Sequence, residues 1–194
     1  MHLENLFPTK FRHKIIEGNE ELNKELITDI CKEMDTGKPA FRSFSKNDLS
    51  WQSDNMTTES FRTLSSQIEL LLGAEYRVTK TWANVIKGAG GFSRPHFHPH
   101  SKSETLIGVY YPQGLTETND YFHNTWSTQE GCLVFLDPTG SHKTTSIDTV
   151  ESLLCIFPQW ATHMVAPMTS DRRRYSIAFT IISKNPLKFQ KKPI

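Results

Sequence analysis

Three histidines at alternate positions are the feature of this sequence best suited to chemistry. They lie in the segment Arg94-Pro95-His96-Phe97-His98-Pro99-His100-Ser101. In an extended strand, alternate side chains point to the same face, so two or three imidazoles would converge on one spot. Because imidazole is the commonest metal ligand in proteins, the spacing predicts a metal site on this strand.

A third ligand comes from farther along the chain. His163 follows the run Phe157-Pro158-Gln159-Trp160, where a strand turns into a loop, and could approach the other histidines from across a barrel. Three protein ligands that leave positions open are typical of a catalytic metal site. With no thiolate in the set, His96, His98 and His163 favour non-haem iron, although zinc and copper also accept imidazoles.

An arginine adds a binding point for an anion. Arg174 opens a predicted strand, and Ser176 lies on the same strand face. A guanidinium stays charged and binds carboxylates bidentately, so the pair would anchor a dicarboxylate whose other end chelates the metal. A five-carbon 2-oxo-dicarboxylate fits this description, with Asn84 as a candidate partner for its metal-proximal carboxylate. In the competing interpretation, Arg174 is part of a solvent-exposed run of three arginines, Arg172 to Arg174.

Two kinds of element must position these residues. Residues 1–75 are predicted to be a helical support region, with one helix capped by Asn19, a second capped by Gly73 and a loop over 41–55. Short β-rich runs separated by Pro- and Gly-containing turns follow, at 76–86, 106–111, 131–136, 152–157 and 174–181. Such runs predict one domain over 1–194, a sandwich or barrel whose one sheet is covered by the two helices.

Alternation predicts which side chains share a face. In the first run, one face would hold Tyr76, Val78, Trp82, Asn84 and Ile86. In the last run, one face is apolar (Tyr175, Ile177, Phe179 and Ile181) and would pack beneath the helices. The opposite face carries Arg174, Ser176 and Thr180, and either water or a cavity would cover it.

Composition restricts the partners. Lys and Arg total 22, Asp and Glu total 21, and the net charge of +1 gives no electrostatic case for nucleic acid or a membrane. No signal peptide and no apolar run of membrane-spanning length is recognised, so we expect a cytoplasmic protein. The three cysteines are predicted to be free thiols, mostly buried. His123 and His142 fall in polar stretches and are predicted to be structural or exposed.

The chain resembles a family of 2-oxoglutarate and Fe(II)-dependent oxygenases found in bacteria and their phages, within the double-stranded β-helix superfamily. The similar stretches occur in order along nearly the whole chain: Leu6-Phe7-Pro8-Thr9, Trp82-Ala83-Asn84, the histidine segment, Gly108-Val109-Tyr110-Tyr111, Phe135-Leu136-Asp137-Pro138, the run from Phe157 to His163, and Arg174-Tyr175-Ser176-Ile177-Ala178-Phe179. Each stretch is weak alone, and their order makes the set specific. The resemblance implies a mainly β jelly-roll, cupin-like core over 76–183 with N-terminal helices packed on one sheet.

The resemblance also implies roles for residues. His96 and His163 match iron ligands, and His98 takes the place where the superfamily usually has an acid. Arg174 and Ser176 match the residues that hold the far carboxylate of 2-oxoglutarate, and Asn84 and Tyr110 are assigned to the same cofactor site. Two other ligand sets stay open: His98 with His100, or a carboxylate from Glu104.

The implied activity is Fe(II)- and 2-oxoglutarate-dependent hydroxylation of a small-molecule or peptide substrate that the sequence does not identify. Two alternatives are a cupin-type three-histidine dioxygenase without 2-oxoglutarate and a jelly-roll binding protein without catalysis. A homodimer stays open. The loop over 112–130, which contains Tyr121, Phe122 and Trp126, is predicted to be a lid or substrate rim.

Overall fold

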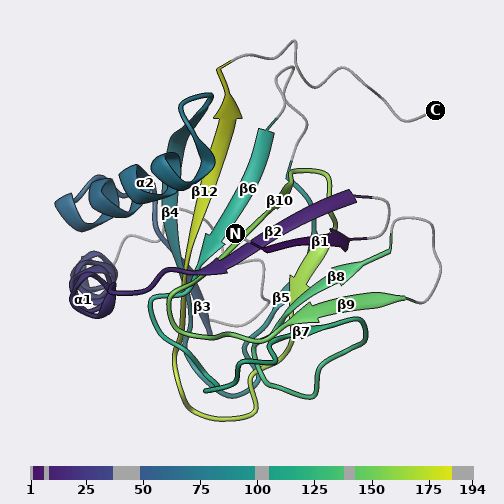
Figure 1. The fold of residues 1–194 in the computed structure, drawn as a ribbon. Coiled ribbons are helices and arrows are strands. Elements are labelled where there is room, and N and C mark those ends of the chain that lie inside the picture. The colour runs from purple at the N-terminus through teal and green to yellow at the C-terminus, as the bar shows by residue number, and fades with distance from the viewer. Residues whose placement is uncertain (1, 7–8, 37–48, 99–104, 138–142, 185–194) are drawn as a thin grey trace.

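Two antiparallel sheets and two helices make up the fold in the computed structural model, which describes residues 2–6, 9–36, 49–98, 105–137 and 143–184 (Figure 1). The larger sheet has the strand order β1-β2-β10-β6-β12-β4-β3, and the smaller has the order β5-β11-β8-β9-β7. The strands are β1 (His2–Leu6), β2 (Thr9–Ile15), β3 (Ser50–Gln52), β4 (Tyr76–Ile86), β5 (Ser93–His96), β6 (Thr105–Tyr110), β7 (Phe122–His123), β8 (Leu133–Leu136), β9 (Thr144–Ile147), β10 (Leu153–Pro158), β11 (His163–Val165) and β12 (Arg174–Ser183). This arrangement confirms the predicted double-stranded β-helix.

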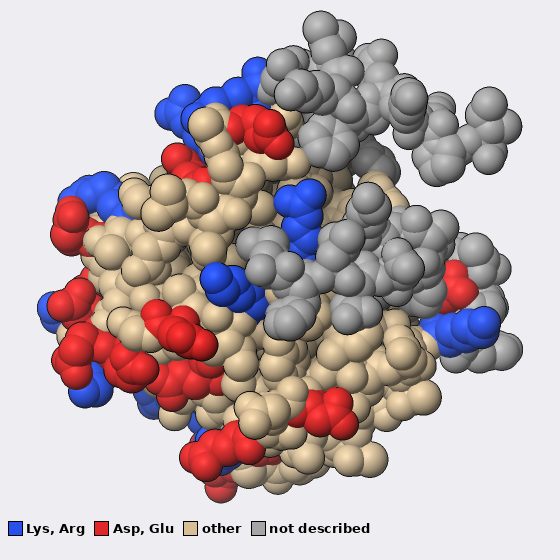
Figure 2. All heavy atoms as spheres, viewed as in Figure 1, with Lys and Arg blue, Asp and Glu red and all other residues tan. Residues whose placement is uncertain are grey.

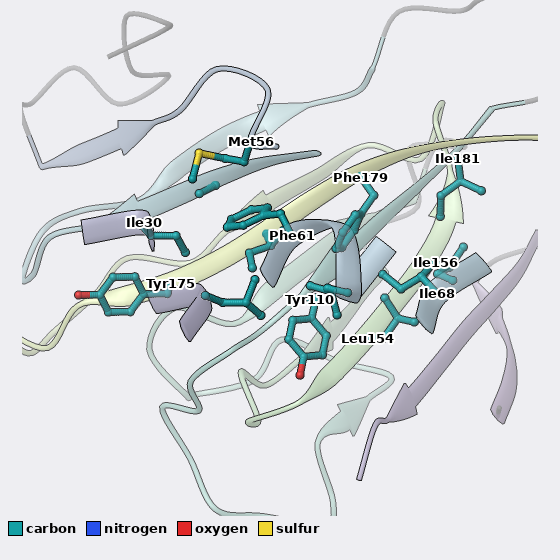
Figure 3. Close-up of a cluster of buried hydrophobic side chains, with 14 of the residues drawn as sticks. Ile30, Met56, Phe61, Ile68, Tyr110, Leu154, Ile156, Tyr175, Phe179 and Ile181 are labelled. Atoms are coloured by element: carbon teal, nitrogen blue, oxygen red, sulfur yellow. The ribbon is translucent and has the colours of Figure 1, made fainter. Parts of the chain in front are cut away.

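Both predicted helices are present and both cover the larger sheet. Helix α1 (Glu20–Asp35) follows Asn19, and α2 (Glu59–Leu72) ends at Gly73, whose φ of 98° suits a glycine cap. Their apolar stripes pack on one face of the sheet, as Figure 3 shows for Ile30, Phe61, Ile68, Ile156, Phe179 and Ile181. The helices therefore stabilise the sheet from outside and leave its other face to the space between the sheets.

Strand β12 lies at the centre of this arrangement, between β6 and β4. Its apolar face (Tyr175, Ile177, Phe179 and Ile181) belongs to the core beneath the helices, as the alternation predicts. Its other face lines a cavity between the sheets through Arg174, Ser176, Ala178, Thr180 and Ile182. Of the two coverings considered for the polar face, the cavity is therefore the observed one.

The prediction for residues 1–75 was incomplete, because this region also contributes β1, β2 and β3 to the larger sheet. Strand β2 buries Phe11 and His13 in the core between the sheets, although its charged sequence gives little strand signal. The loop expected over 41–55 includes β3, and the described part of that range is otherwise irregular. Strand β7 lies in the loop predicted over 112–130, and no strand was predicted for the residues of β9.

A register shift in β4 changes which side chains share a face. Thr180 pairs with Lys80 but Ile181 pairs with Val78, so β4 has one extra residue at this point. A bulge of this kind moves the side chains beyond it to the opposite face. Tyr76 and Val78 therefore contact the helix-side core, whereas Trp82, Asn84 and Ile86 line the cavity. The prediction of one shared face was wrong for this reason.

The surface is mixed in charge. In Figure 2, acidic side chains are most frequent on the side of the molecule where α1 lies, with basic ones among them. Neither described helix has the length and apolar character that crossing a membrane requires. Cys132 and Cys155 are buried free thiols, as predicted, and Cys31 is a half-buried free thiol.

Candidate metal centre

The structure brings His96, His98 and His163 together, with one ligand nitrogen from each lying within 4.8 Å of the others. His96 ends β5 and pairs directly with His163, which opens β11. Cross-strand neighbours on one sheet face lie close together, so the pairing itself forms half of the cluster. His98 lies beyond the end of β5, so the strand alternation argument applies to His96 and not to the whole segment.

The backbone fixes the position of His98. Its N–H donates to the carbonyl of Gln159 at 2.9 Å, and the N–H of Gln159 in turn donates to Thr105 at 3.2 Å. The segment after β10 thus ties the chain beyond β5 to the end of the β10–β6 pair of the larger sheet. The alternative ligands His100 and Glu104 lie outside the described residues.

Hydrogen bonds set the orientation of two imidazoles. Nδ1 of His96 lies 2.8 Å from the carbonyl of Arg94, and Nδ1 of His163 lies 2.8 Å from the carbonyl of Ala161. Because a carbonyl only accepts, each Nδ1 carries the proton and Nε2 carries the lone pair. A backbone carbonyl on the far nitrogen is a common way to orient histidine ligands.

Burial keeps the cluster neutral. It lowers the pKa of His163 to about 3 and that of His98 to about 4, and it lowers the pKa of His96 as well. Phe157 adds to the apolar surroundings, with its ring 4.9 Å from that of His163. Three neutral imidazoles with convergent nitrogens fit a divalent transition-metal ion such as Fe(II).

Arg174 lies buried in the same cavity, with 3% of its surface exposed. Its Nε donates to the carbonyl of Gly131 at 2.7 Å, and its terminal nitrogens donate to Ser176 at 3.1 Å and to the Tyr111 hydroxyl at 3.2 Å. Across the described part of the chain, Arg174 forms no ion pair. A buried guanidinium without a counter-charge is costly, so the site fits an anionic ligand.

The cavity has a volume of about 650 Å³ and joins the arginine to the histidines. Asn84 and Ser176 line it from neighbouring strands, where they are register partners. The predicted set of His96, His98, His163, Arg174, Ser176 and Asn84 thus faces one space.

Tyr110 does not face this space, and its assignment to the cofactor site was wrong. It packs in the helix-side core, and its hydroxyl bonds Asn19 and Asn23. Its neighbour Tyr111 points the other way and contacts Arg174, with the guanidinium 5.0 Å from its ring centre. Both tyrosines belong to the stretch Gly108–Tyr111 that resembles the family. They differ because adjacent residues of a strand point to opposite faces.

The loop over 112–130 does not supply the predicted rim, since none of its residues lines the cavity. Tyr121 and Phe122 instead pack into the core with Phe11. His123 bonds the Asp148 carboxylate at 3.0 Å and is structural, as predicted. Among the described residues, the cavity is lined instead by β3 and by Phe97, which sequence reasoning did not single out.

Comparison with known proteins decides the family. Residues 80–180, just over half of the chain, match the sequence profile of the family described as "Putative 2OG-Fe(II) oxygenase". The chain belongs to this family. It is therefore an Fe(II)- and 2-oxoglutarate-dependent oxygenase, and its cofactors are Fe(II) and 2-oxoglutarate.

Solved structures share the fold of this oxygenase. A Trichoplax adhaerens prolyl hydroxylase, in complex with a peptide fragment of the hypoxia inducible factor oxygen degradation domain, is 15% identical with a TM-score of 0.65, covering 94% of this chain and 87% of its own. A Pseudomonas putida prolyl-4-hydroxylase is 16% identical with a TM-score of 0.61, covering 90% and 92%. A collagen prolyl hydroxylase from Paramecium Bursaria Chlorella virus-1 is 12% identical with a TM-score of 0.59, covering 89% and 95%. None of the curated proteins matches the oxygenase in sequence.

Proposed function

We propose that this oxygenase holds Fe(II) through His96, His98 and His163, binds 2-oxoglutarate through Arg174 and Ser176, and hydroxylates a C–H bond of its substrate. The observation that supports the proposal most is the buried Arg174, which shares one cavity with the histidines and has no acidic partner among the described residues. A dicarboxylate that reaches from the guanidinium to the histidines would satisfy both ends.

Each residue of the site has a role that follows from its position in the cavity. Fe(II) and 2-oxoglutarate, when bound, supply the chemistry that couples decarboxylation of the co-substrate to substrate oxidation by dioxygen. Arg174 and Ser176 orient the far carboxylate. The Tyr111 hydroxyl accepts a hydrogen bond from the guanidinium and so fixes its position. Asn84, which lines the cavity, is proposed to donate a hydrogen bond toward the metal-proximal end. The apolar walls exclude water, which strengthens each of these polar contacts.

A histidine in the acid position makes the metal centre one charge unit more positive than a set of two histidines and one carboxylate. Because neutral His98 contributes no negative charge, 2-oxoglutarate is the anion that offsets the charge of Fe(II). A cupin-type enzyme without 2-oxoglutarate would also accept three histidines, but it would leave the buried Arg174 without an anion. The arginine therefore favours the 2-oxoglutarate-dependent reaction at this site.

Titration of the Fe(II) protein with 2-oxoglutarate under anaerobic conditions tests the proposal. We expect a visible charge-transfer absorption to develop, and Arg174→Met to weaken 2-oxoglutarate binding by about 100-fold, the value of losing a charge-assisted pair. Arg172→Met is the matched control, because Arg172 is exposed and its guanidinium donates to the carbonyls of Gly114 and Leu115 and does not line the cavity. Equal affinity in wild type and Arg174→Met would contradict the assignment.

The class of substrate is proposed only broadly, as a small molecule or a peptide. The Trichoplax adhaerens neighbour holds a peptide, which supports keeping peptides among the candidates. The cytoplasmic location and a homodimer stay predictions.

A further inference from the structure

The cavity wall formed by β4, β12 and β6 is a set of parallel rows of side chains. Asn84 and Ser176 form one row, Trp82, Ala178 and Val109 form the next, and Lys80, Thr180 and Ile107 form the one after that. All of these residues line the cavity. Successive rows are two residues apart along the strands, a step of about 7 Å.

The metal centre lies against the middle row. The ring of His98 is 6.1 Å from that of Trp82. Arg174 and Ser176 are on one side of Trp82 along the strands, and Lys80 and Thr180 are on the other. A dicarboxylate that spans from Arg174 to the histidines therefore occupies one half of the wall and leaves the Lys80 half for another molecule.

Lys80 is the second cation of this cavity. Its ammonium lies 5.7 Å from the centre of the Trp82 ring, and this contact directs the side chain along the wall toward the row beside His98. Lys80 and Arg174 are the charged residues among the described lining, which contains no Asp or Glu. Within the described residues, Lys80 forms no ion pair.

Lys80 is exposed to solvent where it lines the cavity, and its ammonium is the positive charge at this end of the described lining. The far carboxylate of 2-oxoglutarate pairs with Arg174 in the proposed function, so Lys80 is left for the anionic group of another molecule. Thr180, the cross-strand partner of Lys80, places a hydroxyl donor in the same row. An ammonium and a hydroxyl on the same wall can each donate to the oxygens of a carboxylate.

Resting on the proposed function, we propose that the primary substrate is an acid whose carboxylate binds Lys80 and Thr180, at the opposite end of the cavity from Arg174. The body of the substrate lies along Ile107 and Ile182 of this wall and against the half-exposed Phe97, which follows β5 and also lines the cavity. Its oxidisable carbon is then held beside the metal centre at a fixed distance from the carboxylate.

Matched acid and amide probes test this assignment. The protein is loaded with Zn(II) and N-oxalylglycine, a redox-inert analogue of 2-oxoglutarate, so that the Arg174 end is filled. Binding is then measured by ligand-observed NMR for three pairs: 3-phenylpropanoate and its amide, hexanoate and its amide, and N-acetylglutamate and N-acetylglutamine. We expect the acid of at least one pair to bind about tenfold more tightly than its amide, the effect of a charge-assisted contact.

Variants identify the source of that preference. Lys80→Met should reduce the preference to less than twofold, Lys80→Arg should keep it, and Thr180→Val should weaken it by a smaller factor at nearly constant volume. Lys87→Met is the control, because Lys87 is an exposed lysine just beyond β4 that does not line the cavity. Equal binding of acids and amides in every pair, or a preference that survives Lys80→Met, would overturn the inference.

The same experiment separates the two proposals. If N-oxalylglycine fails to bind, or binds equally well to Arg174→Met, the proposed function fails and the Lys80 assignment fails with it. If its binding depends on Arg174 while the acid preference does not depend on Lys80, only the substrate assignment fails.

Discussion

At the scale of single residues, the position of Arg174 depends on a glycine. Gly131 has a φ of 64°, and its carbonyl accepts from Nε of Arg174 at 2.7 Å. A Cβ added at this position would lie 2.8 Å from Leu115 Cδ1 and from Met168 Sδ, and 3.0 Å from Arg174 Cδ. The glycine therefore serves both the backbone turn and the close passage of the arginine side chain.

Gly131→Ala should consequently weaken 2-oxoglutarate binding as well as stability. The clash with Arg174 and Met168 adds about 1–3 kcal/mol to the cost of the left-handed conformation, as overpacking does in cores. Calorimetric titration of the metal-loaded variant with 2-oxoglutarate should show at least a tenfold loss of affinity.

Gly18→Ala separates these two costs. Gly18 has a similar φ of 75°, and an added Cβ would meet nothing within 4 Å. Its variant should lose about 1 kcal/mol of stability from backbone strain and bind 2-oxoglutarate normally. If the two variants bind alike, the packing of Gly131 against Arg174 is not what positions the anchor.

At the scale of elements, the carboxylate of Glu130 joins the turn before β8 to the segment before β12. It accepts from the N–H and hydroxyl of Thr169 and from the N–H and hydroxyl of Ser170, at 2.5 to 3.0 Å. Burial opposes its ionisation, but these hydrogen bonds outweigh burial and lower the pKa of Glu130 to about 2. The clamp thus holds both segments that lead to Arg174.

Glu130→Gln should lower the free energy of unfolding by about 1 kcal/mol at pH 7, because the amide keeps the shape but loses the charge. The folded-state pKa lies below the unfolded value, so this stabilisation is present above about pH 4.5 and is lost as the pH falls toward 2. Urea unfolding at pH 7 and pH 3 should show a clear difference between wild type and variant at pH 7 and a smaller one at pH 3. A difference that grows toward acid would contradict the charged clamp.

Elements with strong periodic signals could be predicted from the sequence, and elements defined by their partners could not. Both helices and β12 carry complete apolar stripes, and their faces were predicted correctly. Strands β2 and β9 are polar or charged in sequence and form because neighbouring strands supply their hydrogen bonds. The bulge in β4 leaves no mark in composition, so the shared face of Tyr76 and Trp82 was predicted wrongly.

At the scale of the whole molecule, the candidate site depends on contacts between distant segments. Residue type and spacing predicted that His96, His163 and Arg174 meet, and each of them begins or ends a strand. His98 lies beyond β5, and the sequence left His100 and Glu104 open as alternatives to it. Gly131, Tyr111 and Gln159 were missed, since their roles come from backbone carbonyls or from side-chain direction after folding. Lys80 was missed because only the register of β4 against β12 places it in the cavity.

A metal ion at the histidines would tie the end of β5 to β11, so its binding should stabilise the whole fold. At an Fe(II) concentration 100 times the dissociation constant, linkage gives about 2.7 kcal/mol. For a chain of this size that is about 5–10 °C in melting temperature. Anaerobic thermal unfolding with Fe(II) or with a chelator measures this shift directly.

His98→Ala is the sharpest variant for this measurement. His98 lies outside the strands and is half-buried, so its loss should lower the metal-free melting temperature by about 2–4 °C, the effect of about 1 kcal/mol. The Fe(II)-induced shift should fall to less than half, because two imidazoles bind a divalent ion far more weakly than three. His123→Gln, which changes a histidine outside the cavity and can keep its bond to Asp148, should retain the full shift. A full shift in His98→Ala would exclude His98 as a ligand and return the third position to His100 or Glu104.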